Sequence, residues 1–510
     1  MQSGEINADV TFGERRAHVR AMGGAVKLKA RRDAGVMNAR ERIDALCDAG
    51  SFTEIGEFAH SVRLEDAART PADGIVTGFG KVEGRVVAVA SFDLTVLGAS
   101  SAQNNIRKLG FLKESASRAG APCAFLIESA GARMPDIQGA AGMGRIGLLN
   151  SNNRDRDTPW VSAVLGPCYG MGTWYAVQSD FTSVRRDAAF SVSSPKVVSV
   201  ALSQEVSPEE LGGADVHAEI TGFADHVGET DAECIAALRR FLSYLPSHAQ
   251  EAPPLGREPV EAHDGARIAA LIPQARSKVY DGRKLVELVA DVGSVLPWRT
   301  RFGRTLETAL ARINGRSVGI VASNPMRKGG AIDGKSCDKM TEFIVLCDSF
   351  NIPMLLLADT PGFLVGLQAE HEAVAGKIMN NLRALHLASV PKIAVVVRKS
   401  YGQAYLNLGG AGADALAVMT TGEVGFVDPS VAVSVVHNRR PAPDDPAYAE
   451  LMQDMVASNS PYALAGIFAA HSVIQPAETR EWVANMLEVY ARRPSAGVGR
   501  HRLATWPTSL

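Results

Sequence analysis

Short runs of apolar, often β-branched residues alternate along the chain with longer stretches whose apolar residues recur at helical spacing. In the first half, the runs typical of buried strands are residues 85–90, 124–127 and 161–165. A stretch typical of an amphipathic helix, residues 104–118, lies between the first two of them. In the second half, runs of the same kind are residues 316–322, 354–358 and 393–397. Strands that alternate with helices predict an α/β fold.

The two halves also resemble each other residue by residue. Gly84 aligns with Gly315 and Pro122 with Pro353, each pair 231 positions apart. After one extra residue, Gly170 aligns with Gly402 at a spacing of 232. A register that holds over about 90 residues with one slip indicates an internal repeat. We therefore predict two copies of one fold, at residues 1–246 and 273–510, joined by a polar, Pro-rich linker at 247–272.

The amino-acid composition excludes several classes of protein. The 510 residues are 46% hydrophobic and 21% charged, with a net charge of -2, so neither a disordered chain nor a nucleic-acid-binding protein is expected. No apolar run approaches the roughly 18 residues of a membrane span. The six cysteines show no CxxC pair and no disulfide framework, and the start of the chain lacks an apolar signal core. We therefore expect a cytoplasmic protein that does not bind a membrane.

The chemistry expected of the chain lies in the loops that follow its apolar runs. These loops are rich in small residues: ESAGA, GPCYGMG, DTPGF and SYGQAY. A buried strand that ends in glycine and enters a helix leaves backbone N–H groups without intrahelical acceptors, and such groups bind anions and developing oxyanions. The eleven histidines are scattered and form no ligand cluster, so no metal is expected.

A locally basic helical region near the start of the chain has two interpretations. It carries Lys27, Lys29, Arg31, Arg32, Arg40 and Arg42. One interpretation is a solvated helix face, and the other is contact with a phosphate-rich substrate. The sequence alone leaves both open.

Seven stretches, in order along the chain, resemble the carboxyltransferase (beta) subunit of biotin-dependent acyl-CoA carboxylases. The resemblance covers the chain from about residue 20 to residue 500. That family includes the propionyl-, methylcrotonyl- and acetyl-CoA carboxylases. The stretches are residues 38–52, 73–85, 128–133, 165–172, 210–217, 346–363 and 400–405. The resemblance implies two tandem crotonase-like domains of the ClpP/crotonase type, a β-β-α spiral.

The resemblance also implies a mechanism. A carboxyltransferase moves CO2 from carboxybiotin to the α-carbon, or the vinylogous γ-carbon, of an acyl-CoA through a thioester enolate. Two oxyanions develop, one on the thioester and one on the ureido oxygen, and the two copies supply one set of backbone donors each. The biotin nitrogen serves as proton acceptor, which agrees with the absence of an obvious catalytic base.

Specific residues match the family's site by resemblance. The donors are Ala130 and Gly131, followed by Gly170 and Met171, in the first copy, and Gln403 and Ala404 in the second. Arg31 and Arg32 are expected to contact coenzyme A, whereas the biotin side includes Gly362, Phe363, Gly402 and Tyr405. Leu406 stands at the acyl-specificity position, where an apolar residue suits an apolar acyl chain.

Two residues depart from the family pattern. Ala130 and Gln403 each stand where glycine is usual. A backbone N–H is kept at both positions, but the Gln403 side chain adds volume and a polar amide beside the expected biotin oxygen. This change is either a tolerated replacement or a sign of altered chemistry.

Neither an Ala-Met-Lys-Met biotinylation motif nor an ATP-grasp signature occurs. Biotin carboxylase and the biotin carboxyl carrier are therefore expected on a separate chain. A homo-oligomer, a hexamer by resemblance, is also expected, with the first copy of one chain facing the second copy of another. The alternatives are a biotin-independent crotonase-type acyl-CoA decarboxylase and, more weakly, a non-catalytic scaffold subunit of a carboxylase complex. The sequence does not identify the acyl group.

Overall fold

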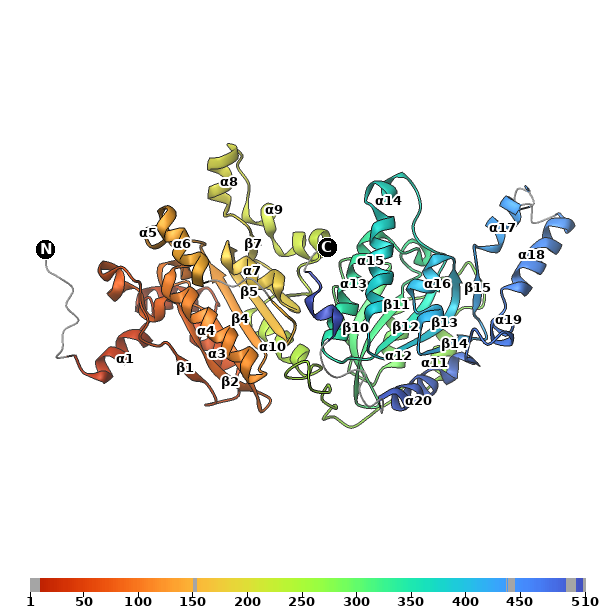
Figure 1. Ribbon diagram of the computed structural model, residues 1–510, viewed down its shortest axis with the longest axis horizontal. Coiled ribbons are helices and arrows are strands. Elements are labelled where there is room, and N and C mark those ends of the chain that lie inside the picture. Colours follow the sequence, from red (N-terminus) through yellow and green to blue (C-terminus); the bar gives the residue numbers. More distant parts are fainter. Residues whose placement is uncertain (1–9, 150–153, 437, 439–444, 492–500, 508–510) are drawn as a thin grey trace. The chain divides into compact units, whose positions relative to one another are not determined.

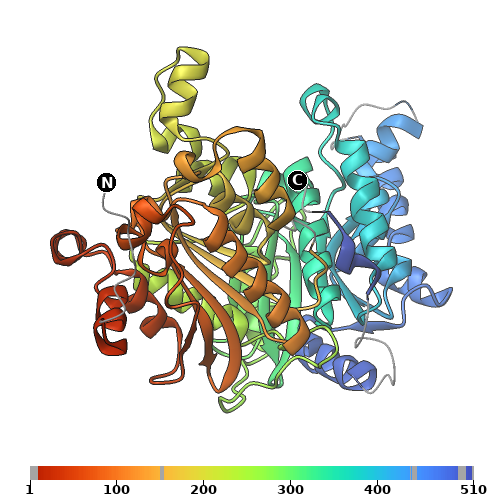
Figure 2. The ribbon, with the colours of Figure 1, turned by 60° about the vertical axis from the view of Figure 1, so that its left-hand side comes forward.

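The computed structural model describes residues 10–149, 154–436, 438, 445–491 and 501–507 (Figure 1). The chain divides into two compact units, unit 1 (Met1–Ser243) and unit 2 (Tyr244–Leu510). Each unit is a twisted sheet with helices packed around it (Figure 2). Among the helices of the described ranges, none combines the length and the apolar character that a bilayer span requires.

Unit 1 contains an eight-stranded sheet with the order β1-β2-β3-β4-β5-β6-β8, in which β7 also pairs with β5. Its strands are β1 (Thr53–Ile55), β2 (Ile75–Val82), β3 (Arg85–Phe92), β4 (Cys123–Ser129), β5 (Trp160–Tyr169), β6 (Phe181–Arg185), β7 (Ala189–Ser191) and β8 (His226–Gly228). Its main helices are α1 (Phe12–Arg20), α2 (Ala25–Asp33), α3 (Ala39–Leu46), α4 (Gln103–Ala119), α6 (Gly139–Leu149), α7 (Met171–Gln178), α8 (Pro195–Leu202) and α10 (Asp231–Leu242).

Unit 2 repeats this sheet with the order β16-β14-β13-β12-β11-β10-β9, in which β15 also pairs with β13. Its strands are β9 (Leu296–Trp298), β10 (Leu306–Ile313), β11 (Arg316–Ser323), β12 (Met354–Thr360), β13 (Lys392–Tyr401), β14 (Ala415–Met419), β15 (Glu423–Gly425) and β16 (Ser472–Ile474). Its main helices are α11 (Ala266–Leu271), α12 (Gly282–Val289), α13 (Gly334–Ser349), α15 (Val374–Leu387), α16 (Gln403–Asn407), α17 (Pro429–Val436), α18 (Pro446–Ser458) and α20 (Thr479–Ala491).

The repeat predicted from the sequence is confirmed strand by strand. Cys123 on β4 lies opposite Trp160 on β5, and the residues that correspond to them, Met354 and Lys392, lie opposite each other on β12 and β13. Each unit begins its core with an antiparallel hairpin, β2–β3 or β10–β11, followed by a helix and a parallel strand. All the strands predicted from apolar runs are present, and the predicted helix at 104–118 is α4.

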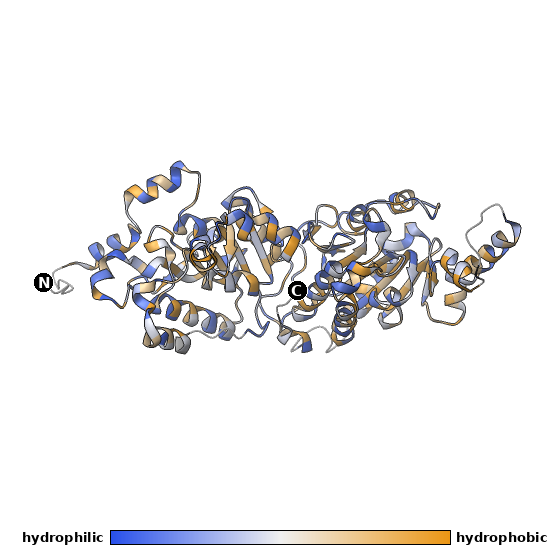
Figure 3. Ribbon diagram, turned by 90° about the horizontal axis from the view of Figure 1, so that it is seen from above, coloured by the Kyte–Doolittle hydropathy of each residue, from blue (hydrophilic) through white to orange (hydrophobic). Residues whose placement is uncertain are grey.

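The core of each unit explains why these runs become strands. The central parallel strands β4 and β12 are buried along their whole length, as expected for strands covered by helices on both faces. Apolar residues gather on the strands, whereas the helices carry apolar residues on one side and polar residues on the other (Figure 3). Because the central strands are buried, the loops at their ends are held in fixed positions.

The residues expected to form a linker, 247–272, make contacts within unit 2. The Gly256 N–H donates to the Gly315 carbonyl at 2.7 Å, and Ala262 forms a bridge with Asp291. The end of this stretch forms α11, in which Ile268 is buried.

Each unit also carries a helix that projects from its body, α8 in unit 1 and α17 with α18 in unit 2 (Figure 1). These helices follow corresponding strands, β7 and β15. Their large apolar residues are exposed: Val200 is 80% and Leu202 68% exposed on α8, and Val435 is 76% exposed on α17. Apolar helix faces of this kind mark surfaces for association.

Candidate functional site

The first candidate loop follows β4 in unit 1. The Ala130 N–H donates to the Gly98 carbonyl at 2.8 Å, and the Gly131 N–H donates to the Ser129 hydroxyl at 3.1 Å. Gly131 has a φ of +99°, which favours glycine. Both N–H groups expected to be oxyanion donors are therefore engaged within the fold, and they hold the loop closed.

The second loop of unit 1 joins β5 to α7 and lies against the first. A Cβ built on Gly170 lies 3.8 Å from the Gly131 Cα. Gly170 has φ 64° and ψ -123°, and its N–H donates to the Ser191 carbonyl at 3.3 Å. The Thr173 N–H donates back to the Gly170 carbonyl at 3.0 Å. The N–H groups between them, those of Met171 and Gly172, find no acceptor among the described residues.

Unit 2 builds the same turn between β13 and α16. Gly402 has φ 60° and ψ -144°, and its N–H donates to the Gly425 carbonyl at 2.9 Å. The Tyr405 N–H donates to the Gly402 carbonyl at 3.1 Å. Within the part of the chain that the structure describes, this leaves the N–H groups of Gln403 and Ala404 without acceptors. We call these two N–H groups the second donor pair, and those of Met171 and Gly172 the first donor pair.

The first donor pair includes a residue that sequence reasoning missed. Gly172 corresponds to Ala404 at the repeat spacing of 232, just as Met171 corresponds to Gln403. The expectation instead named Ala130 and Gly131, followed by Gly170 and Met171, and so included Met171 but not Gly172. The repeat spacing was the available signal, because it carries the second donor pair directly onto Met171 and Gly172.

The loop after β12 matches the loop after β4. The Gly362 N–H donates to the Thr360 hydroxyl at 3.1 Å, and Gly362 has a φ of +125°. Pro361 stands in the place of Ala130 and has no N–H to donate. Phe363 forms a bridge with Ile332, as Ala132 does with Ser101. Gly362 and Phe363 thus shape the rim of the turn, and a Cβ on Gly362 would lie 3.9 Å from the Tyr401 carbonyl oxygen.

Beneath the loop of unit 1 lies a buried cluster of charges. Arg42, fully buried, donates to Glu128 at 2.6 Å and to Asp231 at 2.8 Å. Arg31 also donates to Glu128, at 2.7 Å. Arg185 reaches Asp231 at 2.6 Å. Buried charges need such partners, so this cluster ties the loop after β4 to the N-terminal helices α2 and α3.

The two arginines expected to contact coenzyme A lie in different surroundings. Arg31 is committed to Glu128 and to the Met37 carbonyl, and its side chain is only 13% exposed. Arg32 is exposed on α2 and has no carboxylate partner among the described residues. Of the pair, Arg32 is therefore the one whose charge is available to a ligand.

A polar cluster lies beside the second donor pair. Arg276 forms an ion pair with Glu423 at 2.8 Å and donates to Asp428 at 3.0 Å, and the Tyr401 hydroxyl donates to Glu423 at 2.8 Å. Burial, together with the bond to Glu423, raises the pKa of Tyr401 above its usual value. The phenol therefore stays protonated and holds β15, which accepts the Gly402 N–H.

The side chains of α16 divide between solvent and interior. The Gln403 side chain is exposed and donates to Asn407 at 3.1 Å, whereas Ala404 is buried. Tyr405 is partly buried, which raises its pKa, and its ring packs against Gly410. Leu406 is 37% exposed and so presents an apolar surface next to the turn.

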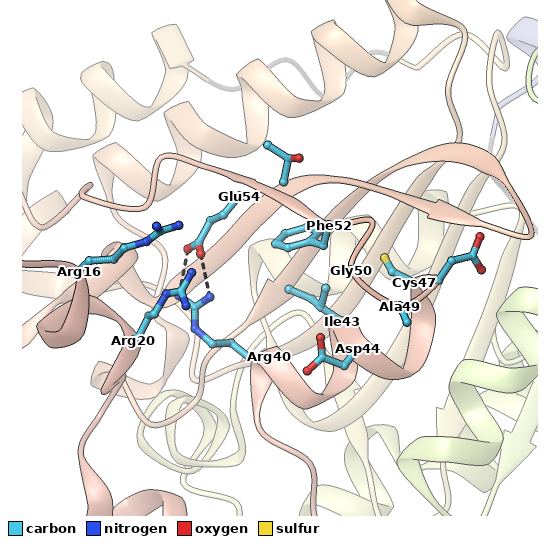
Figure 4. A pocket seen from close by; sticks show the side chains of 12 residues that line it. Arg16, Arg20, Arg40, Ile43, Asp44, Cys47, Ala49, Gly50, Phe52 and Glu54 are labelled. Atoms are coloured by element: carbon cyan, nitrogen blue, oxygen red, sulfur yellow. Dashed lines mark hydrogen bonds and ion pairs between the residues drawn. The ribbon is translucent and has the colours of Figure 1, made fainter. Parts of the chain in front are cut away.

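A separate pocket of about 720 Å³ lies in unit 1, lined by residues of α1, α3 and β1 (Figure 4). Its arginines are matched by carboxylates: Arg40 donates to Glu54 at 2.7 and 3.1 Å, and Arg16 donates to Glu57 at 2.8 Å. Arg40, one of the basic residues considered for contact with a phosphate-rich substrate, lines this pocket, but none of the residues matched to the family's site does. In the described ranges, no group of three or more His, Cys, Asp or Glu residues is arranged to hold a metal ion.

Comparison with known families and structures gives consistent results. The model of the carboxyl transferase domain matches residues 30–503. The chain is 33% identical to the propionyl-CoA carboxylase carboxyltransferase subunit of Haloferax mediterranei, over 96% of this chain and 97% of that protein. It is also 33% identical to the methylmalonyl-CoA decarboxylase subunit alpha of Propionigenium modestum, over 92% and 93% of the two chains.

A solved structure extends the comparison to the fold. The transcarboxylase 12S hexamer, crystallised with methylmalonyl-coenzyme A and methylmalonic acid bound, superposes with a TM-score of 0.88. The alignment covers 96% of each chain at 33% identity. The expected pair of tandem crotonase-like domains is thereby confirmed.

Proposed function

The chain belongs to the carboxyl transferase family, which includes the carboxyltransferase subunits of acyl-CoA carboxylases, and from this premise we propose its reaction. It moves a carboxyl group from carboxybiotin to the α-carbon of an acyl-CoA, or to the vinylogous γ-carbon, through a thioester enolate. The observation that carries this proposal is the pair of matching turns, each with two backbone N–H groups that have no acceptor among the residues the structure describes.

In unit 1, the first donor pair holds the thioester oxygen. Met171 and Gly172 present their N–H groups from a turn that Gly170, Ser191 and Thr173 fix by hydrogen bonds. Removal of the α-proton places negative charge on that oxygen, and donors aimed at it act only as the charge develops. One such donor is typically worth about 3–4 kcal/mol of activation free energy. Ala130 and Gly131 support this turn by closing the neighbouring loop.

In unit 2, the second donor pair holds the ureido oxygen of biotin. The two N–H groups of Gln403 and Ala404 suit an oxygen that gains charge when the carboxyl group leaves. Carboxybiotin supplies the carboxyl group and, after its loss, a basic ring nitrogen that accepts the substrate proton. Gly362, Phe363, Gly402 and Tyr405 shape the rim of this turn, and Leu406 gives the acyl end of the site an apolar surface.

The same proposal implies which molecules the protein binds. Biotin carboxylase and the biotin carboxyl carrier are supplied by a separate chain, and the substrate is an acyl-CoA. The exposed apolar faces of α8 and α17 suit contacts between copies of the chain, in line with the hexamer of the transcarboxylase 12S structure. We propose a hexamer in the cytoplasm.

Turnover of malonyl-type acyl-CoA thioesters, with and without free biotin, tests this function. We expect carboxyl transfer to biotin, with little loss of CO2 when biotin is absent. A methylmalonyl-CoA decarboxylase subunit among the relatives favours decarboxylation as a second candidate. Rapid loss of CO2 without biotin would support a biotin-independent decarboxylase and contradict the main proposal. A protein inert under both conditions, but required by a partner carboxylase for assembly, would indicate a scaffold.

A further inference from the structure

The second donor pair lies on a helix too short to hold its own position. α16 contains five residues, Gln403–Asn407, and ends at Leu408 before two glycines. Isolated helices of this length are unstable, so contacts with the surrounding fold must fix it. Because an oxyanion donor acts only when its N–H is aimed, whatever fixes α16 also sets the strength of the donor pair.

Asn407 is the polar anchor of α16. Its side chain is 1% exposed, and its Nδ2 donates to the Ile378 carbonyl at 3.0 Å and to Asn381 Oδ1 at 2.8 Å, both on α15. An amide carries two N–H donors and one acceptor oxygen. The two donors are therefore used, and the remaining Oδ1 accepts the Nε2–H of Gln403 at 3.1 Å. Gln403 thus completes the hydrogen bonding of a buried amide.

In unit 1, the side chains at the two corresponding positions make packing contacts instead of a hydrogen bond to each other. At the repeat spacing of 232, Met171 corresponds to Gln403 and Tyr175 to Asn407. Tyr175 is buried and stacks on Phe125 with ring centroids 4.8 Å apart, and Met171 packs against the same core. Both turns therefore use the same two positions, one helical turn apart, to secure the donor pair. One pair of side chains is apolar and the other is polar.

We propose that Gln403 is a positioning residue, which fixes the second donor pair by bonding to Asn407. This inference rests on the function proposed above. It explains why glutamine stands where glycine is usual: a glycine at 403 leaves Asn407 Oδ1 buried without this donor. It also separates Gln403 from a direct role, because its amide is directed along α16 to Asn407.

A double-mutant cycle on carboxyl transfer to free biotin tests the inference. The variants are Gln403→Gly, Asn407→Leu and the pair together, with Gln403→Met as a variant of similar length that lacks the donor. We expect Gln403→Gly and Gln403→Met each to lower kcat about tenfold, the loss of one hydrogen bond to a buried group, while KM for the acyl-CoA stays within about twofold. In the Asn407→Leu background, the Gln403 changes should add little.

If Gln403 instead contacts the substrate, its substitution costs the same in both backgrounds, and the inference is wrong. Full activity of Gln403→Gly also overturns it. A readout independent of activity is amide hydrogen exchange in a peptide covering residues 399–408, which we expect to become faster in both Gln403 variants. Unchanged exchange contradicts the inference even if the chain proves to have a different activity. Met171→Gly is the matched control, since it should speed exchange only around residues 168–178.

Discussion

The two units place a buried carboxylate at corresponding positions, yet they neutralise it with arginines from different kinds of element. In unit 1, Glu128 at the end of β4 is bound by Arg42 and Arg31, which come from α3 and α2. In unit 2, the corresponding Asp359 on β12 is bound by Arg398, which comes from the neighbouring strand β13, at 2.8 Å. One loop thus depends on helices outside the repeated sheet, and the other on the sheet itself.

A single position explains the difference. Arg398 corresponds to Gly166 at the repeat spacing of 232. In unit 1, a Cβ on Gly166 would lie 2.3 Å from Glu128 Oε1, so a side chain there would displace the glutamate carboxylate. The longer glutamate fills the space next to Gly166 and is bound by the arginines of α2 and α3. Unit 1 has therefore tied the loop after β4 to the basic N-terminal segment, whereas unit 2 holds the loop after β12 from within its sheet.

The largest effect is expected from Arg42→Met. The change leaves Glu128 and Asp231 buried without their shared cation, and breaking a buried pair in this way costs about 3–5 kcal/mol. Urea unfolding of unit 1, followed by hydrogen exchange, measures the loss. Arg398→Met should destabilise unit 2 and leave the exchange of unit 1 unchanged. As a surface control, Arg118→Met removes an exposed pair with Glu114 and should cost less than about 1 kcal/mol. Equal effects of Arg42→Met on both units would show that the dependence is not confined to unit 1.

The next largest effect is expected from a substitution at Gly172, which compares the two donor turns. Gly172 corresponds to Ala404, and Cys168 to Ser400. A Cβ on Gly172 would lie 2.8 Å from the Cys168 sulfur and 3.2 Å from Ile127 Cγ2. Gly172→Ala should therefore shift the first donor pair and lower kcat by about ten- to a hundredfold, because misaligned donors lose part of the roughly 3–4 kcal/mol by which one donor lowers the barrier.

Steady-state kinetics for the acyl-CoA provide the measurement. Adding Cys168→Ser gives unit 1 the two residues found at these positions in unit 2. Because an oxygen is smaller than a sulfur, this second change makes room for the added Cβ. We expect this second change to restore part of the lost rate. A Gly172→Ala variant with wild-type kcat would mean that the first donor pair lies elsewhere.

How much of the structure could be predicted from the sequence depended on the kind of interaction. The repeat, the strands and the turns after them follow from local patterns, because apolar periodicity and glycine at a strand end act over a few residues. The hydrogen-bond acceptors of individual N–H groups do not follow from such local patterns. Whether Ala130 donates inward to Gly98 depends on a residue 32 positions away, and no local pattern records that bond. The ion pair of Arg31 with Glu128, 97 positions apart, was invisible for the same reason.

Two corresponding lysines, one buried and one partly buried, offer a smaller, pH-dependent contrast. Lys339 in unit 2 corresponds to Lys108 in unit 1, and each donates to the first residue of a hairpin, Leu306 at 2.7 Å and Ile75 at 2.5 Å. Burial lowers the pKa of Lys339 to about 7 and that of Lys108 to about 8, from 10.5. The unfolded chain then holds more protons between these values and 10.5, so the free energy of unfolding rises with pH in that window.

Substitution tests this sign. Each lysine contributes a slope of at most about 1.4 kcal/mol per pH unit. Lys339→Met should flatten the rise of the free energy of unfolding from pH 7 upward, and Lys108→Met should flatten it only from pH 8. Urea unfolding at pH 7, 8 and 9 gives the three curves. Curves parallel to that of the wild type would show that neither lysine loses its proton in the folded protein.

The smallest effect is expected from substitutions of the two arginines of α2, which should have different consequences. Arg32→Glu should raise KM for the acyl-CoA by a few fold and leave kcat unchanged, because a phosphate contact stabilises ground state and transition state alike. Arg31→Glu should behave differently: it places a second carboxylate against Glu128, and so it should lower kcat and stability together. The comparison uses an acyl-pantetheine, which lacks the charged nucleotide, as a second substrate. If Arg32 contacts the nucleotide phosphates, Arg32→Glu leaves KM for the acyl-pantetheine as it was. Equal KM values for wild type and Arg32→Glu with both substrates would make this side of α2 a solvated surface, and the N-terminal segment would then serve unit 1 only through the cations that it places on Glu128.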